Sequence, residues 1–259
     1  MDTFLSTIFT SNFLFLGIAC FVAAFIDSIA GGGGLISLPA FMAAGLNPHL
    51  ALGTNKLAAM FSTIGSACRF AKSKIINWDI VLKISPLSFV GAILGAKTVL
   101  LIDQKYLNPI ALFLLILVLI YTLYNKKMGN INLFESVTKQ SLTYGFILAF
   151  LLGFYDGFFG PGTGSFIIFG LIKIFKFDFM KASGNAKILN LASNISSVIT
   201  FMYYGQIAYI YSLSIGVIMI IGATLGSSFA ISKGTKFIRP IFLIVTFIVT
   251  IKMALNMWY

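Results

Sequence analysis

Charged residues are scarce in this 259-residue chain: they make up 10% of it, against about 25% in soluble globular proteins. So few charges cannot cover a water-exposed surface of this size, which argues against a soluble enzyme. Only 7 residues are acidic, so an acidic disordered chain is excluded as well. Because 59% of the residues are hydrophobic, we interpret the chain as an all-α integral membrane protein.

Residues that bind metals or act as nucleophiles are equally scarce. The two cysteines, Cys20 and Cys68, lie in separate apolar segments without a Cys-x-x-Cys motif, so neither a zinc site nor a disulfide framework is expected. The only histidine, His49, is expected on the other side of the membrane from the nearest serine-bearing glycine motif, so it offers no nucleophile–base pair. That motif, residues 160–165, also lacks the Gly-Lys-Ser/Thr sequence of nucleotide-binding loops. We therefore expect no enzyme, no cofactor and no metal.

The net charge of +11 comes from 18 basic residues, which stand mostly between apolar runs. They do not form the basic and aromatic surface that binds nucleic acid, so nucleic acid is not an expected partner. Basic loops are typical of the cytoplasmic side of membrane proteins. The expected partners are therefore the lipid bilayer and a small anion, in the cell (inner) membrane with several spans; a homodimer is left open.

Ten apolar runs divide the chain, and six of them clearly reach the roughly 20 residues that a membrane-spanning helix needs. Two others are borderline, and each of these is followed, after a glycine-rich break, by a run too short to cross. In chain order the runs are Phe13–Ile29, Leu35–Ala44, Leu50–Phe70, Ile80–Ile102, Leu107–Tyr124, Leu142–Phe159, Phe166–Phe175, Ala182–Met202, Ser212–Ile231 and Ile238–Trp258.

The two halves of the chain repeat each other. Polar and glycine positions match at an offset of 131 residues, or 129 in the first part of each half. The matched pairs include Lys56 with Lys187, Pro109 with Pro240 and Asp27 with Asp156. We predict a first repeat over residues 1–125, a cytoplasmic connector over residues 126–140 and a second repeat over residues 141–259.

Loop charges indicate how the two repeats are oriented. The loop near Ser73 is basic and its counterpart, residues 203–211, has no charge, whereas the connector and residues 232–239 are basic. With basic loops in the cytoplasm, equivalent loops fall on opposite faces, as in many secondary transporters. Each glycine-broken pair then becomes a re-entrant hairpin with its tip near the midplane. We predict two inverted-topology repeats, each with a glycine-broken helical hairpin and three spanning helices; ten short spans are the alternative.

The two glycine-rich tips are candidate parts of a substrate site. Irregular backbone at membrane depth is tolerated only where it is buried in protein or lines a cavity. Each tip precedes a short helix, whose N-terminus attracts an anion; tight helix packing is the alternative role for such glycines. The tip residues of the predicted substrate-binding site are Gly31, Gly32, Gly33, Gly34, Gly160, Gly162, Thr163 and Gly164.

Two lysines complete the predicted binding site. A lysine at the centre of a spanning helix costs about 2.5–3.5 kcal/mol, and Lys56 and Lys187 recur at matching positions. We expect them to bind the anion, although lysines near helix ends can also extend to the membrane surface. The adjacent Asn55 and the nearby Asn185 would supply amide donors.

Two carboxylates stand just before the tips, because Asp27 and Asp156 each precede a tip glycine by four residues. A carboxylate inside a membrane is a functional candidate by default. Each could bind a coupled proton, or could pair with a lysine or with tip N–H groups. The sequence leaves these roles open.

These motifs resemble a known family. The stretches Asp27-Ser-Ile-Ala-Gly-Gly-Gly-Gly and Gly53-Thr-Asn-Lys, with Gly160-Pro-Gly-Thr-Gly and Gly184-Asn-Ala-Lys in the second half, are similar to motifs of the TauE/SafE membrane permeases. The resemblance covers about residues 13–255. It implies transport of small sulfur-containing or organic oxyanions such as sulfite or sulfonates, driven by an ion gradient. We thus expect a secondary transporter with a proton-coupling option; an anion channel or a non-transport membrane factor are the alternatives.

Overall fold

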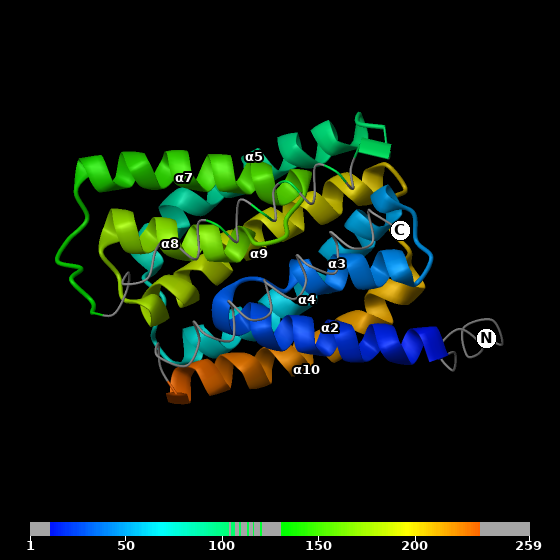
Figure 1. Cartoon of the computed structure of the whole chain (residues 1–259). Coiled ribbons are helices and arrows are strands. Elements are labelled where there is room, and N and C mark those ends of the chain that lie inside the picture. The colour runs from blue at the N-terminus through cyan, green and yellow to red at the C-terminus, as the bar shows by residue number, and fades with distance from the viewer. Residues whose placement is uncertain are drawn as a thin grey trace.

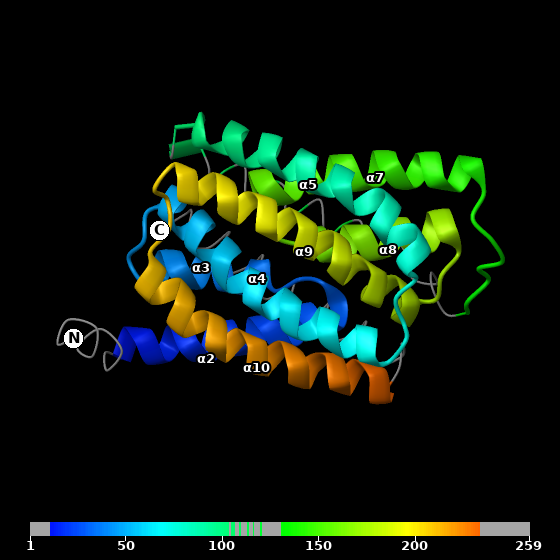
Figure 2. The ribbon, with the colours of Figure 1, turned by 180° about the vertical axis from the view of Figure 1, so that it is seen from behind.

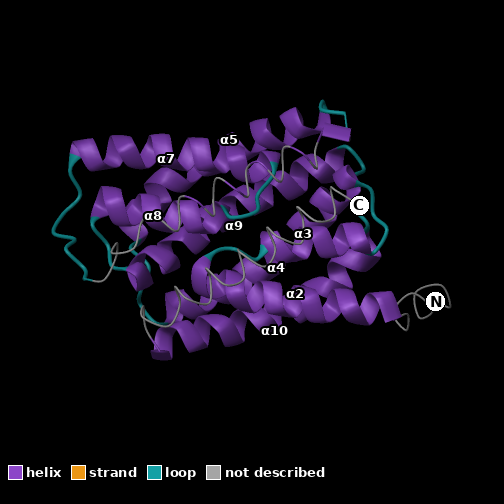
Figure 3. Ribbon diagram, viewed as in Figure 1, coloured by secondary structure: helices purple, strands orange, loops and turns teal. Residues whose placement is uncertain are grey.

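The structure is a computed structural model that describes residues 11–103 and 131–233, with isolated positions 105, 106, 109, 113, 116 and 120. The described residues form eight helices with known bounds and no strand (Figure 3), so the predicted all-α class is confirmed for them. The predicted runs Leu107–Tyr124, apart from isolated positions, and Ile238–Trp258 lie outside the described residues. The helices are α2 (Ser11–Ala30), α3 (Gly34–Ala43), α4 (Pro48–Lys72), α5 (Trp78–Leu100), α7 (Lys139–Phe158), α8 (Thr163–Phe175), α9 (Phe179–Tyr203) and α10 (Tyr209–Lys233).

Four of these helices begin at a side-chain cap that the sequence provides. Asn47, Asn77 and Asp178 accept the backbone N–H three residues later and so start α4, α5 and α9. Thr138 and Ser141 form a reciprocal capping box at the start of α7. Such caps satisfy backbone donors that a helix leaves unpaired at its first turn. The short helices α3 and α8 instead begin after Gly33 and Gly162, which provide no side-chain cap.

The structure and the sequence prediction differ in which helices are long and apolar enough to span a membrane. Among the described residues, the helices long and apolar enough to span a membrane are α2, α5, α7 and α10. The prediction places α4 and α9 among the clear spans and rates α2 and α7 as borderline. The difference has a physical reason, because α4 and α9 contain most of the buried polar side chains of the molecule, which lower their hydropathy.

The helices lie side by side in one elongated bundle (Figure 1). Helices α5 and α7 pack along one edge and α2 and α10 along the opposite edge, with α3, α4, α8 and α9 between them (Figures 1 and 2). Both ends of the α2–α3 hairpin lie at one end of the bundle, on the right in Figure 1, and both ends of the α7–α8 hairpin lie at the other. The two breaks therefore meet in the middle.

Glycines allow the helices at the two edges to approach closely. A methyl group on Gly91 or Gly95 of α5 would overlap carbonyl oxygens of α7, and one on Gly222 or Gly226 of α10 would overlap carbonyl oxygens of α2. Small residues at such interfaces are the usual means of close helix packing in membranes. The edge pairs thus depend on backbone contact rather than on interdigitated side chains.

Gly95→Ala tests this dependence. Alanine favours a helix over glycine by up to about 1 kcal/mol, but here its methyl group would overlap the Phe154 carbonyl, and overpacking costs about 1–3 kcal/mol. We expect a lower midpoint of thermal unfolding in detergent. Gly17→Ala is the matched control, because its methyl group would meet only the flexible Ile218 side chain, at 3.2 Å; equal midpoints for the two variants would contradict the packing argument.

Candidate functional site

The two glycine breaks touch each other at the centre of the bundle. The backbone N–H of Ser165 donates to the carbonyl of Gly31 at 3.0 Å, and the Ser165 hydroxyl donates to the same carbonyl at 2.9 Å. A side chain on either Gly31 or Gly164 would collide with the backbone of the other. Gly31 and Gly160 also adopt positive φ angles of 77° and 97°, which side chains disfavour. Glycine at the breaks thus permits both the turn and the contact between hairpins.

A small cavity lies beside this contact. Its volume is about 40 Å³, room for about three water molecules at about 10–15 Å³ each, and a compact oxyanion belongs to the same size class. The N-termini of α3 and α8 both face it, since Gly33, Gly34, Gly162 and Thr163 contribute to its wall. The cavity is lined by Asp27, Gly31, Gly33, Gly34, Ser37, Asn55, Lys56, Ala59, Ser62, Thr63, Asp156, Gly160, Gly162, Thr163, Gly164, Asn190, Asn194 and Met219.

Two ion pairs stand at the centre, and each joins one half of the chain to the other. Lys56 Nζ on α4 lies 2.9 Å from Asp156 Oδ1 on α7. Lys187 Nζ on α9 lies 2.7 Å from Asp27 Oδ2 on α2 and also donates to the Asp27 carbonyl at 2.5 Å. The lysine side chains are 4% and 0% exposed. Neither lysine therefore extends to the surface, and the pairing that the sequence left open is the arrangement found.

The two carboxylates have different second partners. Asp27 Oδ1 accepts the backbone N–H of Gly33 at 3.1 Å, at the start of α3. Asp156 Oδ2 accepts the hydroxyl of Ser193 at 2.6 Å. A negative charge next to a helix N-terminus is stabilised by the helix dipole, so Asp27 supports the first tip directly. Asp156 and Lys56 both lie against the second tip, because a side chain on Gly160 would come within 2.8 Å of Lys56 Nζ and 3.2 Å of Asp156 Oδ1.

Several buried polar atoms in the cavity wall have no hydrogen-bond partner among the described residues. They include Asn55 Oδ1, Ser62 Oγ and Asn190 Oδ1, whose residues are 5%, 1% and 7% exposed. A buried polar group without a partner costs about 1–3 kcal/mol, so such groups collect where a ligand or water completes them. The cavity is therefore built to take a polar occupant.

Three predicted site residues do not line the cavity. Gly32 is buried but its carbonyl accepts the N–H of Leu35. Asn185 accepts the backbone N–H of Asn77 at 2.8 Å, so it anchors the turn before α5. Lys187 lies behind Asp27. The other predicted residues, both aspartates included, are brought together in the lining.

The lining also contains residues that the sequence prediction gave little weight. Thr63 lies seven residues after Lys56 on α4, Ser62 lies seven residues after Asn55, and Asn190 and Asn194 lie three and seven residues after Lys187 on α9. Steps of three, four and seven residues return to one face of a helix, so helical spacing from the predicted site residues was the signal that could have identified them. His49 lies in the first turn of α4, where its ring contacts the Val99 carbonyl at 3.1 Å, and it is not part of the lining.

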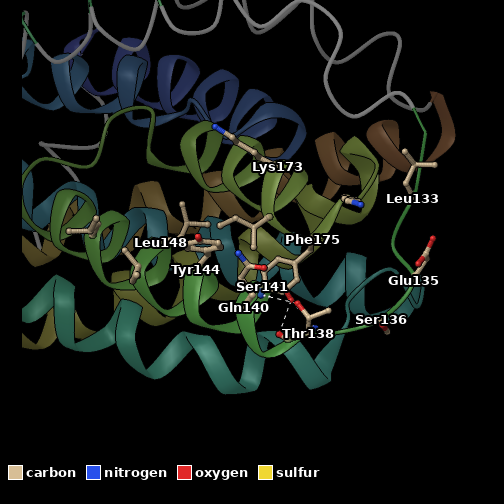
Figure 4. Close-up of a pocket in the computed structure, with 14 residues that line it drawn as sticks. Leu133, Glu135, Ser136, Thr138, Gln140, Ser141, Tyr144, Leu148, Lys173 and Phe175 are labelled. Carbon is tan, nitrogen blue, oxygen red and sulfur yellow. Dashed lines mark hydrogen bonds between the residues drawn. The ribbon is translucent and has the colours of Figure 1, made fainter.

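A larger hollow of about 770 Å³ lies beside the loop 131–138 and the start of α7 (Figure 4). Its size alone would make it a candidate site, but it is an open groove whose charged residues, Glu135, Lys173 and Lys176, are exposed. Its Thr138 and Ser141 satisfy each other in the capping box. The smaller central cavity, with its buried charges and unpartnered polar atoms, is the better candidate.

The comparisons with known proteins agree with one another. Residues 16–253 match the family described as "Sulfite exporter TauE/SafE". A probable membrane transporter protein of Sinorhizobium sp (ORF9) is 38% identical, covering 92% of this chain and 91% of that protein. One of Haemophilus influenzae is 37% identical, covering 92% and 93%, and YfcA of Escherichia coli K12, also named a probable membrane transporter protein, is 38% identical, covering 98% and 94%. No solved structure matches the chain.

The buried pair on α9 can be tested by its effect on stability. Lys187→Met leaves the Asp27 charge without its cation, and breaking a buried ion pair in this way costs about 3–5 kcal/mol. Lys187→Met combined with Asp27→Asn removes both charges and keeps an acceptor for the Gly33 N–H, so most of the loss should be recovered. The thermal unfolding midpoint in detergent measures both.

Lys105→Met is the matched control for this experiment. Lys105 pairs with Asp103 at 3.1 Å, but the two side chains are 64% and 56% exposed, and exposed pairs contribute little. We expect no measurable change. A double variant at Lys187 and Asp27 that is no more stable than the single one would argue against the ion pair.

Proposed function

The chain belongs to the sulfite exporter TauE/SafE family of membrane transporters, and from this we propose that it is a multi-pass secondary transporter of the cell (inner) membrane that carries small anions through the central cavity. The observation that carries the proposal is the convergence on one cavity of two uncapped helix N-termini, a lysine and buried polar atoms without partners. Two partial positive charges of about half an elementary charge each face the cavity, and Lys56, which Asp156 balances when no anion is bound, adds a cation that an anion could bind. Among the described residues, no group of His, Cys, Asp and Glu side chains could hold a metal ion.

We propose sulfur-containing or organic oxyanions, such as sulfite or sulfonates, as the substrate class. The family description supports sulfite, and the size of the cavity suits an anion of few atoms. Hydroxyl and amide groups such as those of Ser62, Asn55 and Asn190 can hydrogen-bond several oxyanion oxygens at once. In the same way the family is one of transporters, which supports a carrier rather than an enzyme.

Two inverted repeats are the architecture that we propose for this transport. Helices α4 (48–72) and α9 (179–203) have the same length at the predicted offset of 131. Two hydrogen bonds between the halves also match at that offset. The Thr54 hydroxyl accepts the Ala208 N–H at 2.9 Å, and at the matching positions the Asn185 side chain accepts the Asn77 N–H at 2.8 Å. The hairpins entering from opposite ends of the bundle suit re-entrant segments whose tips lie near the bilayer midplane. Rocking of one half against the other would then alternate access to the cavity.

Counterflow in proteoliposomes tests the function. Vesicles with the purified protein are loaded in turn with sulfite, thiosulfate, sulfoacetate, acetate or phosphate, and exchange against the same labelled anion is measured. We expect saturable exchange of at least one sulfur oxyanion and its loss, by at least about tenfold, in Lys56→Gln, since one desolvated charge contact is worth about 1.5–3 kcal/mol. Lys105→Gln, an exposed lysine outside the cavity, should exchange normally.

Each other outcome has a distinct meaning. Flux without counterflow would indicate an anion channel. Undiminished exchange in Lys56→Gln would remove the cation from the proposed site, and no flux of any anion by the folded protein would contradict anion transport of this class.

A further inference from the structure

We infer that Asp156 alone binds the coupling proton, and that the substrate anion displaces its carboxylate from Lys56. The inference rests on the proposed function, and it assigns different roles to two aspartates that the sequence alone does not distinguish. In the structure Asp156 holds the position next to Lys56 Nζ, at 2.9 Å, that an oxyanion oxygen would take. The carboxylate therefore occupies the place that the anion would take, and the two compete for the Lys56 ammonium.

Asp156 is satisfied in either protonation state. The hydroxyl of Ser193 lies 2.6 Å from Asp156 Oδ2 and 3.0 Å from the carbonyl of Asn190. When Asp156 is ionised, that hydroxyl donates to the carboxylate. When Asp156 is protonated, it donates to Ser193, and the serine hydrogen turns to the carbonyl. A hydroxyl both donates and accepts, so the site accommodates the proton without leaving a group unpaired.

Asp27 lacks such a partner. Its two oxygens accept from the Gly33 N–H at 3.1 Å and from the Lys187 ammonium at 2.7 Å, and neither donor can accept a proton in return. A protonated Asp27 would find no acceptor for its O–H among these two partners. The residue that matches Ser193 at the offset of 131 is Ser62, whose hydroxyl has no partner among the described residues. Asp27 therefore lacks the accepting hydroxyl that Asp156 has in Ser193.

The two lysines also differ in how many protein partners they have and in whether they line the cavity. Lys187 Nζ donates both to the Asp27 carboxylate and to its carbonyl, and it does not line the cavity. Lys56 lines the cavity, and Asp156 is its one partner among the described residues. An ammonium has three donors, so Lys56 retains hydrogens for an anion. Lys187 and Asp27 form a fixed clamp, and Lys56 and Asp156 form the exchangeable pair.

Charge balance fixes the stoichiometry. Without substrate, Lys56 and Asp156 sum to zero charge. With a monoanion on Lys56, Asp156 must take one proton for the buried site to stay neutral, because uncompensated charge is strongly disfavoured there. One proton is therefore carried with each anion, and transport of a monoanion is electroneutral.

Few other titratable groups reach Asp156 among the described residues. Lys56 faces it from α4, and Asp27 of α2 lines the same cavity with Lys187 of α9 behind it. Tyr155 precedes it on α7 and donates its hydroxyl to a tip carbonyl at 2.7 Å. Other charged residues of the packed helices α5, α8 and α9 do not line the cavity: Asp79, Lys83, Lys97, Lys173 and Lys181.

Equilibrium binding of two monoanions, methanesulfonate and acetate, to the purified protein between about pH 6 and pH 9 tests the assignment, because a sulfonate and a carboxylate each keep a single negative charge in that range. Linkage to one proton makes the apparent Kd rise about tenfold per pH unit where Asp156 is ionised. Asp156→Asn should abolish this slope and bind at least about tenfold more tightly than the native protein at the alkaline end. Lys187→Met with Asp27→Asn should keep the slope, as should the exposed control Asp103→Asn.

A second measurement covers the case in which Asp156→Asn does not fold. Infrared difference spectra on adding methanesulfonate, a monoanion without a carboxyl group, should show the C=O band of a newly protonated carboxyl group of the protein. Asp156→Glu, which keeps the carboxyl, should shift that band, and the double variant at Lys187 and Asp27 should not.

The outcomes separate this inference from the proposed function. Anion counterflow with an unchanged pH slope in Asp156→Asn, or with an unshifted band in Asp156→Glu, overturns the assignment of the proton to Asp156 and leaves the transporter standing. A pH slope that disappears only when Asp27 is changed overturns it as well. Absence of anion counterflow and binding in the native protein overturns both proposals.

Discussion

The neutralisation of charge inside an apolar bundle is the constraint on which this structure depends. Two lysines and two aspartates lie among helices that contain few other charges, and each would be costly alone. The chain meets this constraint with ion pairs between its two halves. Lys56 of the first half pairs with Asp156 of the second, and Lys187 of the second pairs with Asp27 of the first. Neither half can satisfy its own charges, so the two must assemble for either to be stable.

The glycine breaks follow from the same pairing between the halves. Each aspartate stands one turn before a break, so the pairs can form only if the two tips approach one another in the interior. The contact between Gly31 and Gly164 leaves no room for a side chain. A short helix that starts at such a break has no side-chain cap from its first residue, so its N-terminal dipole is directed at the cavity, where Asp27 contacts the start of α3. The backbone geometry required for close approach thus also produces the positive potential.

Much of this could be predicted from sequence, because apolar runs and glycine clusters are local signals. The bounds of the described helices follow the apolar runs within a few residues, and the lysines, aspartates and tip glycines stood out as polar or flexible positions in apolar surroundings. The partners could not be predicted, because pairing depends on how the halves cross. Asn185 shows the limit: it lies near Lys187 in sequence, yet its amide anchors the Asn77 N–H because α9 turns it away from the cavity.

Sequence similarity between the halves also conceals a difference that only their packing reveals. The matched aspartates have the same spacing from their tips, which suggests equal roles. Asp27 is enclosed by two donors, whereas Asp156 meets a hydroxyl with two alternative bonds. Two aspartates at matching positions can therefore have different roles without any change in residue type at the charged positions. Asp156, the proposed proton site, differs from Asp27 because its neighbour is the hydroxyl of Ser193, whereas Asp27 meets a backbone N–H. The difference between the two aspartates would therefore come from their uncharged partners.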